Sequence, residues 1–189
     1  MNTIKWFNNY EKEGVGDIYE GAFEIKNFEN GQLILKADDK QFILNPNHTQ
    51  FRKYHKGHIG NIYSTYAISD LLLHRKNLHR IDKRMLNFGT HCVVIKDAKK
   101  FVDSIFAKLT EMNYTFSHKI VSYKKFTNKD INLSLFHKNH LLSYQKEYRI
   151  IVWTKENLPL RFEIGSIENY AEIYSAEELI KNFTIGFQE

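Results

Sequence analysis

Residues 92–112 read CVVIKDAKKFVDSIFAKLTEM, and this stretch decides the fold. Its first four residues are apolar, which is typical of a short buried strand. Asp97 can then cap a helix whose apolar residues recur every three or four positions, at Phe101, Val102, Ile105, Phe106, Leu109 and Met112. The pattern predicts a strand followed directly by an amphipathic helix, with Cys92 and the apolar stripe in a core.

Strand patterns lie on both sides of this stretch. Residues 21–26 alternate between apolar and polar side chains, and residues 32–36 and 41–44 are separated by four residues, as in a hairpin. Further strands are predicted at residues 58–67, 119–123, 148–153, 160–164 and 170–174. The strands at 148–153 and 160–164 are predicted to form a second hairpin.

Helices are predicted at residues 69–86, at residues 133–145, and in a short last segment capped by Ser175. Strands therefore dominate both ends of the chain, and helices lie between them. This order favours an α+β fold over an alternating α/β fold, with two to four helices packed on mostly antiparallel strands. The length of 189 residues favours one globular domain over residues 1–189.

The composition excludes several kinds of site. Cys92 is the only cysteine, so neither an intrachain disulfide nor a multi-cysteine zinc site can form. The sequence contains no glycine-rich dinucleotide or phosphate loop, no nucleophile elbow and no calcium loop, so we identify no cofactor and no metal site. Residues 1–10 lack the apolar segment of a signal peptide, and no run of about 18 apolar residues occurs, so we expect a cytoplasmic protein without a membrane partner.

The charge is unevenly distributed along the chain. Lys and Arg outnumber Asp and Glu by 11 to 3 in residues 51–100 and by 8 to 4 in residues 101–150, whereas acidic residues outnumber basic ones at both ends. A basic middle predicts attraction for an anion, either a phosphorylated nucleotide-type ligand or a nucleic acid.

The densest basic segment is residues 74–84, where seven of the eleven residues are His, Lys or Arg. On a helix, Arg80 and Arg84 would lie in one row, with Arg75 in a neighbouring row. Guanidinium groups suit phosphate because they offer paired donors and keep their charge, so these three arginines are candidate ligand-binding residues. The alternative interpretation is an ordinary solvated helix face.

A second candidate site is the segment DIYEG at residues 17–21. Asp17 and Glu20 are two carboxylates just before a glycine, a pattern that fits general-base or metal chemistry. The same pattern fits turn residues that lead into a strand. Glu20 is kept as a candidate catalytic residue.

A third candidate site lies at residues 136–149. Glu147 and Arg149 share one face of the predicted strand, and Lys138 and Tyr144 are nearby in the sequence. They form either a salt-bridge network or a pocket in which Lys138 and Arg149 contact phosphate and Tyr144 stacks on a base, with Glu147 as a candidate catalytic carboxylate. Because both faces of this strand carry apolar residues, we expect Arg149 to be covered and paired with Glu147 or Glu20.

Short motifs in a fixed order connect these segments to a known group of proteins. They are Asp17-x-x-Glu20-Gly21, Tyr63-x-x-Tyr66, Asn87-Phe88-Gly89, Phe136-x-Lys138 and Gln145-x-Glu147-Tyr148-Arg149-Ile150. On these motifs the chain resembles a large uncharacterised family of bacterial and phage proteins associated with phage defence. The resemblance implies an α+β domain and a role in bacteria–phage conflict, and it supplies no known reaction.

The charge pattern and the resemblance together lead to one main expectation and two alternatives. We expect a protein of bacteria–phage conflict, either a defence effector or a phage counter-defence factor, that binds a phosphorylated nucleotide-type ligand. A nucleotide- or NAD-using transferase or hydrolase with Glu20 or Glu147 as the catalytic residue is the first alternative. An RNA- or DNA-binding module is the second, and a homo-oligomer is open in each case.

Overall fold

A four-stranded antiparallel sheet forms the centre of the molecule. The computed structural model describes residues 1–12, 14–55, 60–68 and 79–185. The order of the central sheet is β1 (Asn2–Thr3), β6 (Asn61–Tyr66), β13 (Glu147–Val152) and β9 (Phe116–Ile120). Both edges of β13 are therefore hydrogen-bonded to neighbouring strands.

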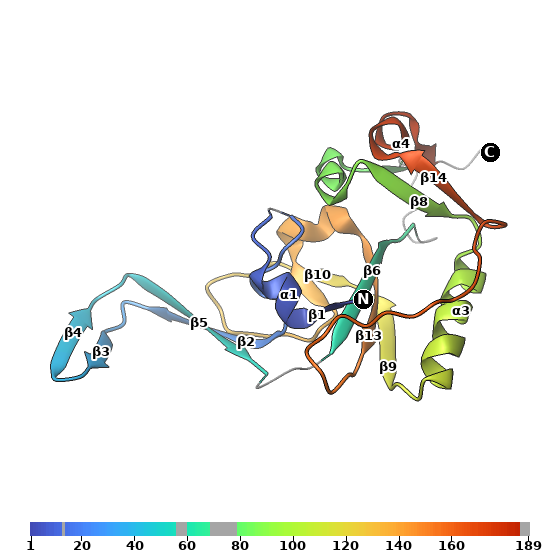
Figure 1. Cartoon of the computed structure of the whole chain (residues 1–189). Helices are drawn as coiled ribbons and strands as arrows, with labels where there is room; N and C mark the ends of the chain where they lie inside the picture. The colour runs from blue at the N-terminus through green and yellow to red at the C-terminus, as the bar shows by residue number, and fades with distance from the viewer. Residues whose placement is uncertain (13, 56–59, 69–78, 186–189) are drawn as a thin grey trace.

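One face of this sheet is covered by α3 (Ala98–Glu111), which begins where Asp97 accepts a hydrogen bond from the backbone N–H of Lys100. Its buried stripe, Phe101, Ile105 and Leu109, packs with Ile150 and Val152 of β13. The prediction of this capped amphipathic helix is confirmed (Figure 1).

The opposite face of β13 is also apolar. Ile151 packs with Ile62 of β6 and with Ile4 of α1 (Ile4–Asn9), a short helix capped by the hydroxyl of Thr3. Because side chains alternate along a strand, Glu147 and Arg149 lie on this same covered face. The central strand therefore places two charged side chains on an interior face of the protein.

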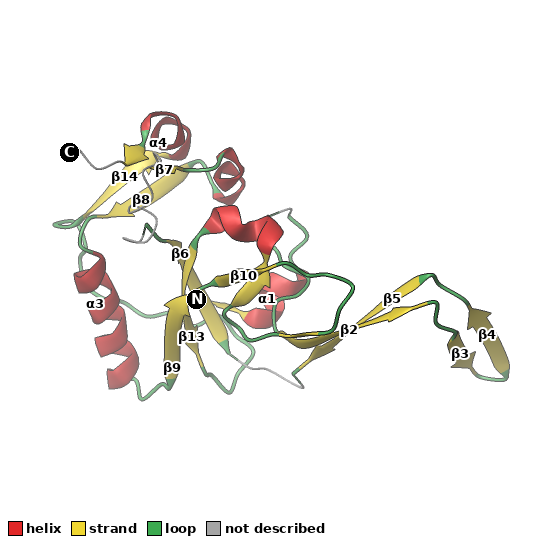
Figure 2. Cartoon of the chain, turned by 180° about the vertical axis from the view of Figure 1, so that it is seen from behind, coloured by secondary structure: helices red, strands yellow, loops and turns green. Residues whose placement is uncertain are grey.

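A long antiparallel ribbon projects from the body (Figures 1 and 2). Its base pairs β2 (Ala22–Glu29) with β5 (His48–Tyr54), and the short strand β11 (Ile131–Asn132) joins the edge of β2. Its tip is the hairpin of β3 (Leu33–Ala37) and β4 (Lys40–Leu44), which confirms the hairpin predicted from the spacing of the two runs.

Smaller pairs of strands complete the fold. β8 (His91–Ile95) pairs with β14 (Ala171–Ser175), and the hydroxyl of Ser175 caps α4 (Ala176–Asn182) as predicted. β7 (His79–Arg80) pairs with β15 (Thr184–Ile185). β10 (Ser122–Lys124) and β12 (His137–Asn139) form a parallel pair beside the 3₁₀ helix η2 (His140–Gln145). A second 3₁₀ helix, η1 (Lys83–Phe88), contacts η2.

The α+β class with mostly antiparallel strands is confirmed, although the short helices α1 and α4 lie near the two ends of the chain. Within the described residues, no helix has the length and apolar character needed to cross a membrane.

The helix predicted at residues 69–86 is wrong where it can be compared. Residues 69–78 lie outside the described residues, and the rest of the segment forms β7 and η1. The carboxylate of Asp82 accepts the backbone N–H of Arg84 and starts a new turn at Lys83, which breaks the segment into two elements. The predicted rows of Arg80 and Arg84 on one α-helix are therefore absent.

Three other predicted elements differ from the structure. In place of a helix at residues 133–145, residues 137–145 form β12 and η2, because the Asn139 side chain caps a 3₁₀ turn at Leu141. Residues 160–164 form no strand, since β6 and β9 already occupy both edges of β13. Residues 92–95 do form a strand, but it pairs with β14 at the periphery, which leaves Val93 exposed and Cys92 only partly buried.

Candidate functional site

Five buried polar side chains form one connected group, which we call the buried charge network: Glu20, Lys138, Gln145, Glu147 and Arg149. Each is at most 6% exposed. Two carboxylates and two cations in an apolar setting carry a large desolvation cost, which only close pairing can offset. The hydrogen bonds of the network supply that pairing.

Arg149 is the centre of the network. Its Nη1 and Nη2 atoms donate to the two carboxylate oxygens of Glu20, each at 2.9 Å. Nη2 also donates to Oε2 of Glu147 at 3.0 Å, and Nη1 donates to the carbonyl oxygen of Leu135. Among the described residues, Nε of Arg149 has no hydrogen-bond partner. The expected pairing of Arg149 with an acidic residue is therefore present, with both candidate carboxylates.

Lys138 extends the network toward η2. Its Nζ lies 2.5 Å from Oε1 of Glu147 and 2.8 Å from Oε1 of Gln145. The Gln145 amide in turn donates to the carbonyl oxygen of Gly14. Ser64 on the neighbouring strand donates to Oε2 of Glu147 at 2.9 Å. Each oxygen of Glu147 thus accepts hydrogen bonds from buried donors.

The local sequence explains how Glu20 reaches Arg149. Asp17 shapes a tight turn, because its side chain accepts the N–H of Tyr19 (2.9 Å) and its carbonyl accepts the N–H of Glu20 (2.8 Å). Asn8 of α1 holds this turn from outside, with its amide on the carbonyl of Glu20 at 3.1 Å. Gly21 then takes a positive φ of 80°, which a glycine adopts at little cost. The turn fixes the Glu20 side chain against β13.

The pKa values of the two carboxylates of the network are shifted in opposite directions. Burial opposes the charge of Glu147, but Lys138 and Arg149 outweigh that effect and lower its pKa to about 2. Burial raises the pKa of Glu20, against the opposing attraction of Arg149 and Lys138. Glu147 is shared by both cations at hydrogen-bond distance, whereas Glu20 contacts Arg149 alone, which accounts for the difference.

We expect this difference to be visible in acid. Because the pKa of Glu147 is lowered in the folded state, its contribution to stability is present above the unfolded pKa of about 4.3 and is lost as the pH falls toward 2. The free energy of unfolding, measured with urea between pH 5 and pH 2, should fall by on the order of 3 kcal/mol from this group. Glu20, whose pKa is raised, contributes in the opposite sense as it takes up a proton at a higher pH.

The matched variant for this measurement is Lys138→Met, which removes a cation that holds the pKa of Glu147 down. Its stability should be lower at neutral pH, and the loss between pH 5 and pH 2 should be smaller than in the wild-type protein, because the folded-state pKa of Glu147 moves closer to its unfolded value. Acid profiles that coincide after correction for the neutral-pH difference would show that Lys138 does not control Glu147.

The network reaches the surface through Tyr144 and Arg84. Tyr144 precedes Gln145 in η2 and is buried, and the guanidinium of Arg84 in η1 lies 3.7 Å from the centre of its ring. Arg84 also pairs with Asp82 at 2.7 Å, while about half of its side chain stays exposed. Asp82 and Tyr144 together hold a half-exposed guanidinium beside η2, the helix that carries Gln145 of the buried charge network.

The structure thus brings together most of the residues that the sequence singled out. Hydrogen bonds join Glu20, Arg149, Glu147 and Lys138, and Arg84 lies over Tyr144, which is next to Gln145 of the network in the chain. Arg80 is exposed on β7, and Arg75 lies outside the described residues. Tyr144 is covered by Arg84, so it supports that guanidinium and does not offer a free face to a base.

Sequence reasoning missed the neutral members of the site. Ser64 lies directly opposite Arg149 in the register of β6 and β13, and its role depends on that pairing. Gln145 is the first residue of the motif Gln145-x-Glu147-Tyr148-Arg149-Ile150, so the resemblance could have indicated it as a site residue. In the part of the chain that the structure describes, no three His, Cys, Asp or Glu side chains are grouped to hold a metal ion.

Comparison with protein-family models, with curated proteins and with solved structures finds no match to this chain.

Proposed function

We propose that this protein binds a phosphorylated nucleotide-type ligand on the surface formed by η1 and η2. The observation that carries the proposal is the Arg84 guanidinium, whose Cζ lies 3.7 Å from the centre of the buried Tyr144 ring while about half of the side chain is exposed. Nε and Nη2 of this guanidinium donate to the carboxylate of Asp82, and Nη1 donates to the carbonyl of Leu141, so Arg84 would contribute its positive charge and a planar surface on which a nucleobase can stack. Arg80 and Lys83 are exposed in the same basic segment and add positive charge.

The phosphate-binding residues proposed here are not Lys138 and Arg149, which the sequence had suggested. The Nζ of Lys138 and both terminal nitrogens of Arg149 donate to groups of the protein, and both side chains are buried. We therefore assign phosphate contact to the exposed cations Arg80 and Lys83, and stacking on the base to Arg84. The buried charge network is assigned a positioning role, since it fixes the segment that carries Tyr144.

A role in bacteria–phage conflict is part of the proposal and rests on the family resemblance. The structure adds one supporting observation: residues of three motifs, from two distant parts of the chain, meet in the buried charge network, namely Glu20, Lys138, and the trio Gln145, Glu147 and Arg149. A fourth motif, at residues 87–89, includes the end of η1.

The test is a binding measurement on the purified protein. Small molecules that co-purify are identified by mass spectrometry, and ATP, NAD and cyclic dinucleotides are titrated by calorimetry. Arg84→Ala should weaken the binding of the active compound at least about tenfold, equivalent to 1.4 kcal/mol. Its Tm should stay close to the wild-type value, because Arg84 is half exposed.

Arg161→Ala, which changes an exposed arginine outside the basic segment, is the matched control and should bind normally. The proposal fails if no anionic compound co-purifies and none of the three nucleotide classes binds. It also fails if Arg84→Ala and Arg161→Ala bind the active compound equally well.

A second candidate is an enzyme that uses a nucleotide or NAD, with Glu20 or Glu147 as its carboxylate. The observation that favours it is the opposed shift of the two pKa values, a pattern found where one carboxyl group acts as an acid and another as a base. The same calorimetric titration separates the two candidates, because an enzyme consumes the bound compound and a binder returns it unchanged.

A further inference from the structure

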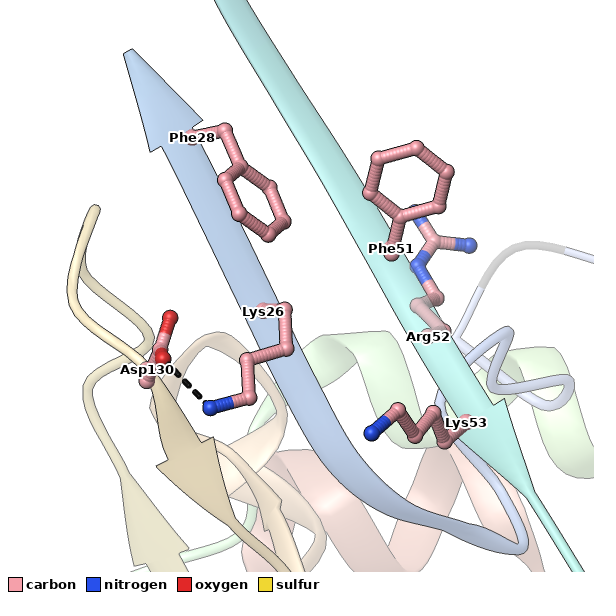
Figure 3. A pocket seen from close by; sticks show the side chains of 6 residues that line it. All are labelled: Lys26, Phe28, Phe51, Arg52, Lys53 and Asp130. Carbon is pink, nitrogen blue, oxygen red and sulfur yellow. Dashed lines mark hydrogen bonds and ion pairs between the residues drawn. The ribbon is translucent and has the colours of Figure 1, made fainter.

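The projecting ribbon carries apolar side chains that the body of the molecule does not cover. Seven of them are between 46% and 53% exposed, and they fall into two patches along the ribbon. The base patch is the pair Phe28 and Phe51, whose ring centres lie 5.7 Å apart on the same side of the ribbon (Figure 3). The tip patch lies on the hairpin of β3 and β4 and consists of five side chains: Ile34, Leu35, Phe42, Ile43 and Leu44.

The hairpin at the tip lacks a covering layer. Figures 1 and 2 show it as the part of the ribbon farthest from the central sheet, and within the described residues β3 and β4 pair only with each other. Their register places Leu35 and Phe42 on one face and Ile34 and Ile43 on the other, so both faces are apolar. A hairpin of two strands is only marginally stable in water, and exposed apolar patches mark interaction surfaces. The tip therefore needs a partner.

The spacing of the two patches selects a second copy of the chain as that partner. Residues 30–32 and 45–47 separate the patches and hold no large apolar side chain. Phe28 lies three residues before Gly31 and Ile34 three residues after it, which is about 10 Å on each side of the middle of the ribbon. If two ribbons run in opposite directions about a two-fold axis through this middle, each tip patch meets the base patch of the other copy. A two-fold interface requires this kind of self-complementarity.

The charges of the ribbon argue against a nucleic acid or a lipid bilayer as the partner. Residues 24–53 hold five Lys or Arg and four Asp or Glu, and so even a balance gives a polyanion little attraction. Lys53 at the base pairs with Glu24 and Lys26 pairs with Glu24 and Asp130, so these cations are already compensated. A bilayer would have to take up the four charged residues of the turn before the apolar side chains behind them, at a high cost: Lys36, Asp38, Asp39 and Lys40.

We propose that two copies of this chain associate by clasping their ribbons, with the tip of each on the base of the other. The seven half-exposed apolar side chains, at roughly 90 Å² of exposed surface each, contribute about 600 Å² from each copy. Neighbouring polar atoms bring the buried surface close to the roughly 800 Å² per partner that a stable interface needs. The clasp also gives each exposed face of the hairpin tip a second layer of strands to pack on, which the ribbon of one copy cannot supply.

The oligomeric state of the full chain is measured by sedimentation velocity between 1 and 200 µM, where the wild-type protein should shift from monomer to dimer. The tip variant is Phe42→Ser with Ile43→Ser, and the base variant is Phe28→Ser with Phe51→Ser. Each should weaken dimerisation by about tenfold or more, because both tip-to-base contacts of either homodimer lose one side. Both variants should keep the circular dichroism spectrum of the wild type, since the changed side chains lie outside the core clusters of the body.

A mixture of the two variants tests the tip-to-base arrangement itself. The intact tip of the base variant meets the intact base of the tip variant, so a heterodimer keeps one of the two contacts and should form more readily than either homodimer. A ribbon that had only lost its shape would not be rescued in this way. Ile173→Ser, which changes a 73% exposed side chain on β14, is the matched control and should dimerise like the wild type.

A wild-type chain that stays monomeric at 200 µM would overturn the proposal, as would a dimer that neither variant weakens or a mixture that dimerises no better than its components. A monomer that instead co-sediments with phosphatidylglycerol vesicles, and loses this binding in the tip variant, would assign the ribbon to a lipid surface. The ribbon shares no residue with the proposed nucleotide site. Arg84→Ala should therefore dimerise like the wild type, so failure of the nucleotide site and failure of the clasp can be told apart.

Discussion

Arg149→Met should lower the free energy of unfolding by about 3–5 kcal/mol, or prevent folding, because it removes the cation from a buried ionic network. Methionine fills much of the space but cannot donate a hydrogen bond. Glu20 would lose both of its charge-assisted bonds to Arg149, and Glu147 would keep only Lys138 and Ser64. Urea unfolding followed by circular dichroism at pH 7 measures the loss.

Arg161→Met is the matched control, since it makes the same chemical change at an exposed position and should alter stability by less than about 0.5 kcal/mol. A second variant keeps the prediction testable if Arg149→Met does not fold. Adding Glu20→Gln removes the carboxylate that Arg149→Met leaves unpaired, so this double variant should recover part of the stability. No recovery, or an Arg149→Met protein as stable as the wild type, would mean that the ion pairs do not hold this region together.

The same variant separates the two interpretations of Arg149 that the sequence left open. A ligand contact would leave the fold intact and abolish binding of the nucleotide. If Arg149 is a structural cation, its replacement lowers the stability of the fold, and any loss of nucleotide binding is a consequence of the displaced η2 segment. The bidentate pairing with Glu20 and the burial of Arg149 favour the structural cation.

The burial of Arg149 was predictable because alternation along a strand is a local property. Ile150 and Val152 mark one face of β13 and Ile151 marks the other, so a sequence reader can infer that both faces are covered. A buried guanidinium then requires an anionic partner. The helix α3 was predictable for the same reason, since its stripe and its Asp97 cap lie within 16 consecutive residues.

The partners of Arg149 and the order of strands in the central sheet depend on contacts between residues far apart in the chain. The spacing of residues along the sequence does not encode such contacts. Glu20 lies 129 residues before Arg149, and only a turn clamped by Asn8 brings it there. The segment at residues 160–164 has a strand-like pattern, but no edge of β13 is left for it. The sequence of this segment shows its propensity to form a strand. It does not show that β6 and β9 take both edges of β13.

The segment at residues 79–88 shows a different limit. Its basic residues fall at helical spacing, and that spacing alone favours a helix. The carboxylate of Asp82 interrupts the helix, because it accepts a hydrogen bond from the backbone N–H of Arg84 and pairs with the Arg84 guanidinium. The same contact orients Arg84 toward Tyr144, so the feature that broke the predicted helix also builds the exposed guanidinium of the candidate site.

Leu109→Ala should lower the free energy of unfolding by about 2–5 kcal/mol, because it opens a cavity in the core between α3 and the central sheet. Leu109 has no exposed surface and belongs to the cluster that includes Ile150 and Val152 of β13. The backbone around the cavity is held by the ladders of β13 with β6 and β9, so the site has little freedom to collapse. Urea unfolding at pH 7 again gives the measurement.

Thr110→Ala, one residue further along the same helix and exposed, is the matched control and should change stability by less than about 0.5 kcal/mol. Leu109 lies on the face of the sheet that α3 covers, whereas the buried charge network lies on the face that α1 covers. Leu109→Ala should therefore weaken the fold without moving the acid transition of Glu147. A loss below about 0.5 kcal/mol would contradict a buried stripe and would identify this helix face as a surface for association of the chain with itself.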